Sequence, residues 1–205
     1  MLAGLSAALG AGLLWGLVFL TPLLLADYPP FMLAIGRYLA FGVLALGLAW
    51  FDRAALARLT RADWIEAVKL ALVGNLLYYT TLASAIQLAG GPVPTLIIGT
   101  LPVVIAITAN LLDRHRGGGE DSAPWIRLAA PLALILGGLF AVHLASAQAL
   151  PADASADYLL GIGCGLFALG CWTWYPIRNS RWLRARGAGL SRAWATAQGD
   201  RKSVV

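Results

Sequence analysis

Charge is scarce in this chain. Charged residues make up 12% of the 205 residues, whereas a soluble domain carries about a quarter. Hydrophobic residues reach 60%, and the mean hydropathy is +0.75. The alternating pattern of a β-barrel is also missing, so helices are the remaining way to satisfy the backbone in lipid. We therefore expect an all-α fold, a polytopic bundle of transmembrane helices.

Cysteine and histidine are almost absent, with two of each. Cys164 and Cys171 would lie about 10 Å apart along a helix axis, which is too far for a disulfide. His115 and His143 have no Cys or carboxylate at metal-ligand spacing. Walker loops, dinucleotide fingerprints and G-x-S-x-G motifs are missing as well. The sequence therefore predicts neither an enzyme nor a cofactor or metal site.

Long apolar runs are abundant, and each can cross about 30 Å of hydrocarbon. They are Leu2–Leu25, Phe31–Phe51, Trp64–Leu88, Val93–Leu112, Leu128–Ala147 and Tyr158–Ile177. The first run has no basic segment before it and no small-residue cleavage site after it, so we interpret it as a retained helix. Ala193–Gly199 would open a seventh helix but is too short to span.

Basic residues mark every second gap between these runs. The gaps 52–63, 113–127 and 178–192 carry arginines, and the gaps that alternate with them carry no basic residue. Cytoplasmic loops collect Lys and Arg, which places these gaps and the N-terminus in the cytoplasm. Because the charges are scattered, the net charge of +5 does not indicate nucleic acid. We expect a multi-pass protein of the inner (plasma) membrane, with the lipid bilayer as a partner.

Polar residues inside the runs are costly in lipid and therefore indicate function. In the third run, Asn75, Tyr78 and Tyr79 share one helical face. Asn75 either lines a wet cavity or bonds to another helix. Pro102 removes a backbone hydrogen bond near the middle of the fourth run and predicts a kink. That kink either borders a cavity or serves packing alone.

Arg37 is the one basic residue deep inside a run, about 10 Å from the outer end of its helix. It either snorkels to the surface, binds an anionic group such as a carboxylate inside the bundle, or packs against a helix C-terminus. The pairs Gly12–Gly16 and Gly161–Gly165 favour close helix packing.

Candidate substrate-binding residues come from five of the runs. They are Trp15, Arg37, Asn75, Tyr78, Tyr79, Thr95, Pro102, Trp172 and Tyr175. Trp172 and Tyr175 share a face of the sixth run. Tyr175 and its neighbour Trp174 also fit an interfacial aromatic belt, and that alternative stays open.

Short motifs occur in a fixed order along the first four runs. They are Leu14-Trp15-Gly16-x-x-Phe19, Arg37-Tyr38 with Ala40-Phe41, Arg61-Ala62-Asp63-Trp64, Tyr79-x-x-Leu82-Ala83 and Leu101-Pro102-Val103. This set resembles the EamA family of the drug/metabolite transporter superfamily. One departure is Asp113, where the family often ends its fourth helix with Glu. The resemblance implies ten helices in two inverted halves, with the substrate between them.

The function implied by the resemblance is secondary transport, with export of small metabolites or amino acids by alternating access. The cavity would be lined by the first, third, fourth and sixth runs. A non-catalytic membrane assembly protein is an alternative. An intramembrane lipid enzyme is a weaker one, because the runs lack a cluster of carboxylate, His or Ser at one membrane face.

The same resemblance divides the chain. Residues 1–147 correspond to a first five-helix repeat and 148–199 to the start of a second. The tail 200–205 reads like a translated sequencing-library adapter, and we expect it to be foreign to a natural protein that continues. The alternative is a genuine basic C-terminus. The missing second repeat, or a homodimer partner, would then complete the site for the small-molecule substrate.

Overall fold

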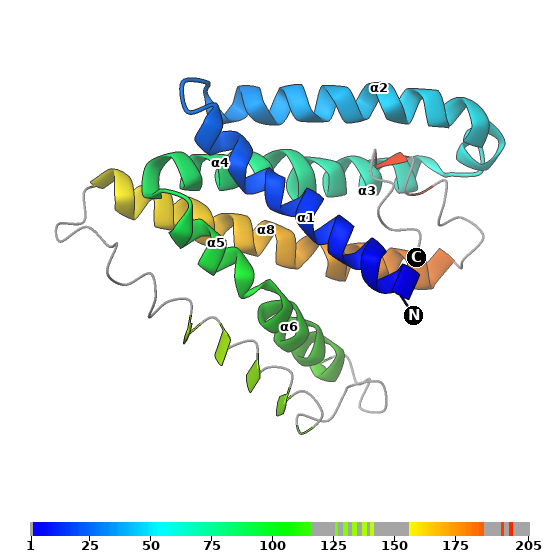
Figure 1. The fold of residues 1–205 in the computed structure, drawn as a ribbon. Helices are drawn as coiled ribbons and strands as arrows, with labels where there is room; N and C mark the ends of the chain where they lie inside the picture. The colour runs from blue at the N-terminus through cyan, green and yellow to red at the C-terminus, as the bar shows by residue number, and fades with distance from the viewer. Residues whose placement is uncertain are drawn as a thin grey trace.

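The computed structural model describes residues 2–115 and 156–186, with isolated positions between 126 and 141 and between 194 and 198. Every regular element of this part is helical (Figure 1). The elements are α1 (Leu2–Leu24), α2 (Pro30–Leu56), α3 (Arg61–Ala71), the π-helix η1 (Leu72–Leu77), α4 (Tyr78–Ala89), α5 (Pro92–Gly99), α6 (Leu101–His115) and α8 (Ala156–Arg186). The predicted all-α fold is confirmed.

The helices follow the apolar runs closely. α1, α2 and α8 correspond to the first, second and sixth runs, α3–η1–α4 to the third, and α5–α6 to the fourth. Within the described part, Pro30–Phe51, Pro92–His115 and Ala156–Arg186 have the length and composition to cross a membrane. Most of the fifth run, 128–147, lies outside the described residues, as do His143 and the tail 200–205.

A capping box opens α3. The side-chain oxygen of Thr60 accepts a hydrogen bond from the Asp63 N–H at 3.3 Å, and Asp63 Oδ2 accepts one from the Thr60 N–H at 2.9 Å. The box satisfies two N–H groups that a helix start leaves unpaired. The rod continues through η1 into α4 and ends at Gly90, whose φ of 77° favours glycine and lets the chain turn.

The fourth membrane stretch is broken beside Pro102. α5 ends at Gly99, and Thr100 separates it from α6. Pro102 has no N–H to donate to the carbonyl four residues earlier, so the helical ladder is interrupted there. Thr100 stabilises the break, because its N–H and its hydroxyl both donate to the Ile97 carbonyl, at 3.1 and 2.6 Å. The predicted kink is confirmed.

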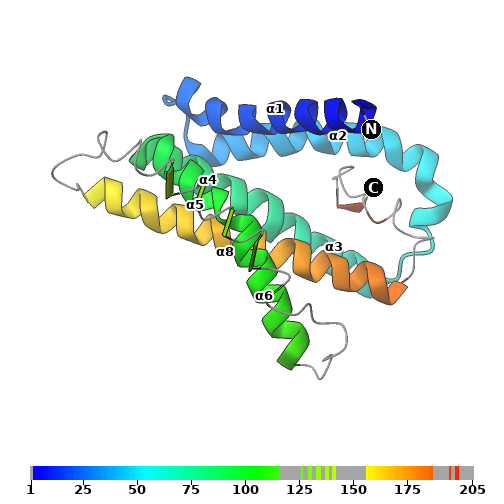
Figure 2. The same ribbon diagram turned by 60° about the horizontal axis from the view of Figure 1, so that its bottom comes forward.

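α8 packs along α4 in the most extensive helix contact of the described part (Figures 1 and 2). A Cβ built on Gly161 would lie 2.8 Å from the Ala89 Cβ, and one on Gly165 would lie 3.0 Å from a side chain of α5. This glycine pair therefore allows the close approach that the sequence predicted. Gly12 and Gly16 differ, because a Cβ there meets no atom of the described residues within 4 Å.

α1 and α2 form a hairpin, and each of them packs on α4. Their outer faces expose large apolar side chains, including Leu13 at 77%, Leu24 at 79% and Leu46 at 74%. A soluble protein buries such side chains, whereas lipid favours them on the outside. The core lies inside this surface, at Val18, Ala34, Tyr78, Tyr79, Leu82, Ile86, Ile98, Leu101, Ala168 and Cys171.

Candidate functional site

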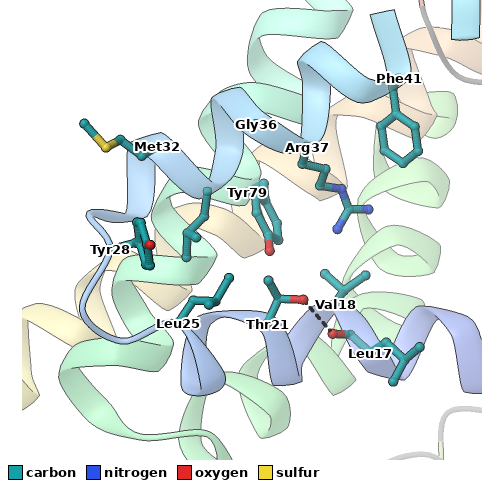
Figure 3. Close-up of a pocket in the computed structure, with 11 residues that line it drawn as sticks. Leu17, Val18, Thr21, Leu25, Tyr28, Met32, Gly36, Arg37, Phe41 and Tyr79 are labelled. Carbon is teal, nitrogen blue, oxygen red and sulfur yellow. Dashed lines mark hydrogen bonds between the residues drawn. The ribbon is translucent and has the colours of Figure 1, made fainter. Parts of the chain in front are cut away.

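A cavity of about 820 Å³ lies between α1, α2 and α4, and we call it the hairpin cavity (Figure 3). It is lined by Leu17, Val18, Thr21, Leu25, Tyr28, Met32, Leu33, Gly36, Arg37, Phe41 and Tyr79. α1 contributes its C-terminal half and α2 its N-terminal half. The cavity therefore occupies the half of the bundle nearer the α1–α2 loop, and its size suits a small molecule.

Gln87 of α4 ties the α1–α2 loop to the rest of the bundle. Its Nε2 donates to the carbonyls of Tyr28 and Leu25, at 3.0 and 3.4 Å. Carbonyls at the end of a helix have no intrahelical partner, so this side chain satisfies groups that would otherwise need water. Pro30 then starts α2 at a position where its missing N–H costs nothing. These contacts hold the two walls of the cavity at a fixed distance.

Three aromatic rings surround the guanidinium of Arg37. Its Cζ lies 4.7 Å from the ring centroid of Tyr79, 5.4 Å from that of Phe41 and 5.9 Å from that of Tyr38. Aromatic faces attract cations. Within the described residues Arg37 has no ion pair, and its Nε is buried without a hydrogen-bond partner. Of the placements that the sequence left open, the geometry agrees with the one inside the bundle.

A row of stacked rings joins α4 to α8 beside Tyr79. The ring centroids of Tyr78 and Trp172 are 4.6 Å apart with planes at 29°, and those of Trp172 and Tyr175 are 5.3 Å apart at 16°. The Tyr175 hydroxyl donates to Gln198 Oε1 at 3.0 Å. The Tyr78 hydroxyl is buried and has no partner among the described residues. Aromatic stacking gives this junction rigid, shape-specific contact.

The π-helix η1 directly precedes Tyr78 in the chain. It contains Asn75, which is 8% exposed. A π-turn widens the helix and loosens its hydrogen-bond ladder, and such turns often occur at functional sites. Asn75 does not line the hairpin cavity. It therefore marks an irregular turn between the two halves of the third membrane stretch.

A buried carboxylate closes the opposite end of the bundle. Asp63 is 2% exposed, and its Oδ1 accepts hydrogen bonds from Trp182 Nε1 at 3.0 Å and from an Arg186 guanidinium nitrogen at 2.7 Å. Its Oδ2 accepts from the N–H and the hydroxyl of Thr60. Burial alone would raise the pKa of Asp63, but these hydrogen bonds and the charge of Arg186 hold that pKa below its usual range. Asp63 is ionised at neutral pH.

Two further ion pairs join α8 to its neighbours at this end. Arg178 pairs with Glu66 of α3, and Arg181 lies 3.9 Å from a carboxylate oxygen of Asp113 at the end of α6. Two of the three contacts link α8 to the third membrane stretch, and one links it to the fourth. We call them the basic-end clasp: Asp63–Arg186, Glu66–Arg178 and Asp113–Arg181.

The structure brings several predicted site residues together. Arg37 and Tyr79 line the hairpin cavity, and Tyr78, Trp172 and Tyr175 form the stacked row beside it. Sequence reasoning paired them only within single helices, because helical spacing relates residues of one helix alone.

Other candidates lie elsewhere. Thr95 and Pro102 are exposed on α5 and α6 and do not line the cavity, and the side chain of Trp15 lies outside the described residues. The sequence reasoning also missed lining residues such as Phe41 and Tyr28. Phe41 follows Arg37 by four positions, one helical turn, and that spacing could have identified it.

The described residues contain no group of three or more His, Cys, Asp or Glu that could hold a metal ion. The cavity wall instead combines apolar side chains, two tyrosines and one cation. Such a wall binds a solute by shape, dispersion and a single charge contact. Together with the long apolar helices, this arrangement defines a multi-pass α-helical membrane protein with a solute-sized site.

The profile of the EamA-like transporter family matches residues 2–116, more than half of the chain. The chain belongs to this family, as its motifs predicted. The inner membrane protein YtfF of Escherichia coli (strain K12) is 47% identical over 199 residues, which are 97% of this chain and 61% of that protein. The chain therefore spans about three fifths of the length of this relative. No solved structure matches the chain.

Proposed function

We propose that the protein is a secondary transporter that exports small metabolites or amino acids by alternating access, with the hairpin cavity as its substrate site. One observation carries this proposal. The cavity lies at one end of the bundle, and the basic-end clasp closes the other. A carrier of this kind opens to one side at a time and needs reversible contacts at the closed side. Ion pairs between separate helices fit that role.

The charge pattern supports an orientation of the bundle in the membrane. The segments richest in arginine lie at the clasp, which by the positive-inside rule faces the cytoplasm. The hairpin cavity then faces the outside, and the conformation described here is the outward-facing one. Export would load the substrate after the clasp opens and release it in this conformation.

The stacked row fits the same cycle. Tyr78, Trp172 and Tyr175 lie where α4 meets α8, and opening of the clasp would separate these helices from the cytoplasmic side. We assign the three rings to contact with the substrate in that state. Thr95 and Pro102 are assigned to the bend between α5 and α6, because both are exposed and distant from the cavity wall.

We propose residues 1–147 as the first repeat and 148–199 as the start of the second. α8 then belongs to the second repeat, and the clasp lies between repeats, where inverted-repeat carriers move. Transport is accordingly proposed for the complete protein, whose remaining repeat, or a second copy of the chain, would supply the rest of the cavity.

The test is counterflow in proteoliposomes that contain the full-length protein, with labelled amino acids and organic acids as the panel. Arg37→Gln and Tyr79→Ala change the cavity wall. Arg53→Gln is the matched control, because Arg53 is exposed at the end of α2 and contacts Trp50 instead. We expect the two cavity variants to lower counterflow at least about tenfold, as the loss of a charge-assisted contact implies, and the control to preserve it.

Two results would contradict the proposal at different levels. Equal counterflow in all three variants would remove the hairpin cavity as the substrate site. Absence of counterflow for every solute in the panel, from a monodisperse protein, would contradict transport itself.

A further inference from the structure

We propose that the hairpin cavity takes an organic monoanion with an apolar body and no ammonium group, and that Arg37 binds its anionic oxygens. The inference rests on the proposed function and narrows its substrate class from small metabolites and amino acids to acids without an amine.

The first argument is the charge of Arg37. Among the described residues that line the cavity, it is the only charged one. Buried charges in proteins are normally paired, because an isolated ion loses its hydration. The rings of Tyr38, Phe41 and Tyr79 replace part of that hydration. Arg37 has no carboxylate partner among the described residues. A carboxylate bound in the cavity would supply one to the end of the side chain, since its two oxygens match the planar fork of a guanidinium.

The second argument concerns what an ammonium group would meet. The described lining residues include no Asp or Glu. An ammonium group would find no carboxylate among them and would be repelled by Arg37, which disfavours a zwitterion.

The third argument is the rest of the wall. Apart from Arg37, the cavity wall carries aliphatic and thioether side chains that can bury a nonpolar body. Met32 is unbranched and adapts to different shapes. The apolar lining residues are Leu17, Val18, Leu25, Met32, Leu33 and Phe41. A charged end at Arg37 and a nonpolar remainder along these residues describe one ligand class.

The test uses three probes that share a phenyl ring and differ in charge: phenylacetate, phenylalanine and phenethylamine. Binding is measured by isothermal titration to the full-length protein in phosphatidylcholine nanodiscs. We expect phenylacetate to bind at least about tenfold more tightly than phenylalanine, and phenethylamine not to bind. Equal affinity for phenylacetate and phenylalanine, or tighter binding of phenethylamine, would overturn the inference. This comparison needs no variant.

Variants locate the anion. Arg37→Gln should abolish phenylacetate binding, Arg37→Lys should retain a part of it because the charge stays but the planar fork is lost, and Arg53→Gln should bind as the parent does. Unchanged binding in a monodisperse Arg37→Gln protein would overturn the assignment. If that variant aggregates, the probe series and Arg37→Lys decide the question.

An anionic oxygen group could come from a soluble acid or from a phospholipid. Replacing phosphatidylcholine with phosphatidylglycerol separates the two: competition with phenylacetate identifies lipid phosphate, and unchanged affinity identifies a soluble acid. Counterflow of phenylalanine that depends on Arg37 would overturn the inference and leave the transporter proposal intact. Phenylacetate binding without counterflow of any solute would support the anion site and contradict transport.

Discussion

The ring of Tyr175 occupies the space where a side chain on Gly74 would lie. A Cβ built on Gly74 would be 2.2 Å from Tyr175 Cδ2 and 2.6 Å from its Cγ. Gly74 belongs to η1, so the Tyr175 side chain of α8 packs directly on the backbone of the wide π-turn in the third membrane stretch. Any substituent at this position has to displace a ring that is stacked on Trp172.

Gly74→Ala should therefore destabilise the bundle. We expect a loss of about 1–3 kcal/mol in the free energy of unfolding, the usual range for an overpacked core. Unfolding by SDS in mixed micelles measures it. Gly163→Ala is the control, since a Cβ there meets open space, and alanine should be neutral or should stabilise the helix by up to about 1 kcal/mol. Equal stability of the two variants would show that Tyr175 does not fill this space in solution.

Local signals predicted the helices and the break beside Pro102. A proline acts on the turn that precedes it, and a capping box such as Thr60–Asp63 lies within four residues. The π-turn had no such signal, and the ring that packs on it belongs to Tyr175, far along the chain. The same holds for the bond from Trp182 to Asp63, whose partners are 119 residues apart. Hydrophobic periodicity predicts single helices, but it does not predict which helices, distant in the sequence, contact one another.

Arg37 shows the same limit within the candidate site. Its depth in the second run was evident from the sequence, but depth alone permits snorkelling as well as binding inside the bundle. The rings of Tyr38 and Phe41 come from its own helix, whereas the nearest ring belongs to Tyr79 of α4. The packing of α2 on α4 decides where the guanidinium lies, and that packing could not be predicted from one helix.

Asp63 makes the clasp sensitive to acid. Its pKa is held below the ordinary value of about 3.9 in the folded protein. A carboxyl with a lowered folded-state pKa stabilises the fold above the ordinary pKa, and this contribution is lost as the pH falls through the folded value. We expect stability to decline below about pH 4, measured as unfolding against pH. Asp63→Asn should be less stable at pH 7 and lack this part of the decline, whereas the exposed-loop variant Asp27→Asn should match the parent at pH 7.

Removal of the Tyr78 hydroxyl should change the stability of the protein and leave its ligand binding unchanged. Tyr78→Phe removes a buried oxygen that has no partner among the described residues and keeps the ring stacked on Trp172. Because an unmet buried hydroxyl costs free energy, we expect the free energy of unfolding to rise by up to about 1 kcal/mol. Phenylacetate affinity should stay unchanged, because Tyr78 is not among the residues that line the hairpin cavity. A less stable variant would indicate that the hydroxyl has a structural partner, and weaker phenylacetate binding would indicate that it reaches the anion site.

The clasp can be tested with a thiol that the chain already carries. Cys171 is unpaired and 6% exposed, in the core between α4 and α8. In a Cys164→Ser background, Glu66→Gln should weaken the ion pair to Arg178 and raise the population in which α8 separates from α3. A membrane-impermeant maleimide applied from the clasp side should then label Cys171 about fivefold faster, a shift that partly exposed ion pairs can supply.

The matched control for this labelling is Asp157→Asn. Asp157 is exposed near the start of α8, at the end away from the clasp, and its loss removes the same charge without touching an ion pair of the clasp. Labelling should stay at the parent rate. A rise of equal size in both variants would mean that net charge, and not opening at the clasp, controls access to Cys171. Faster labelling from the opposite side of the membrane would reverse the orientation inferred from the arginines, because the opened clasp would then face that side.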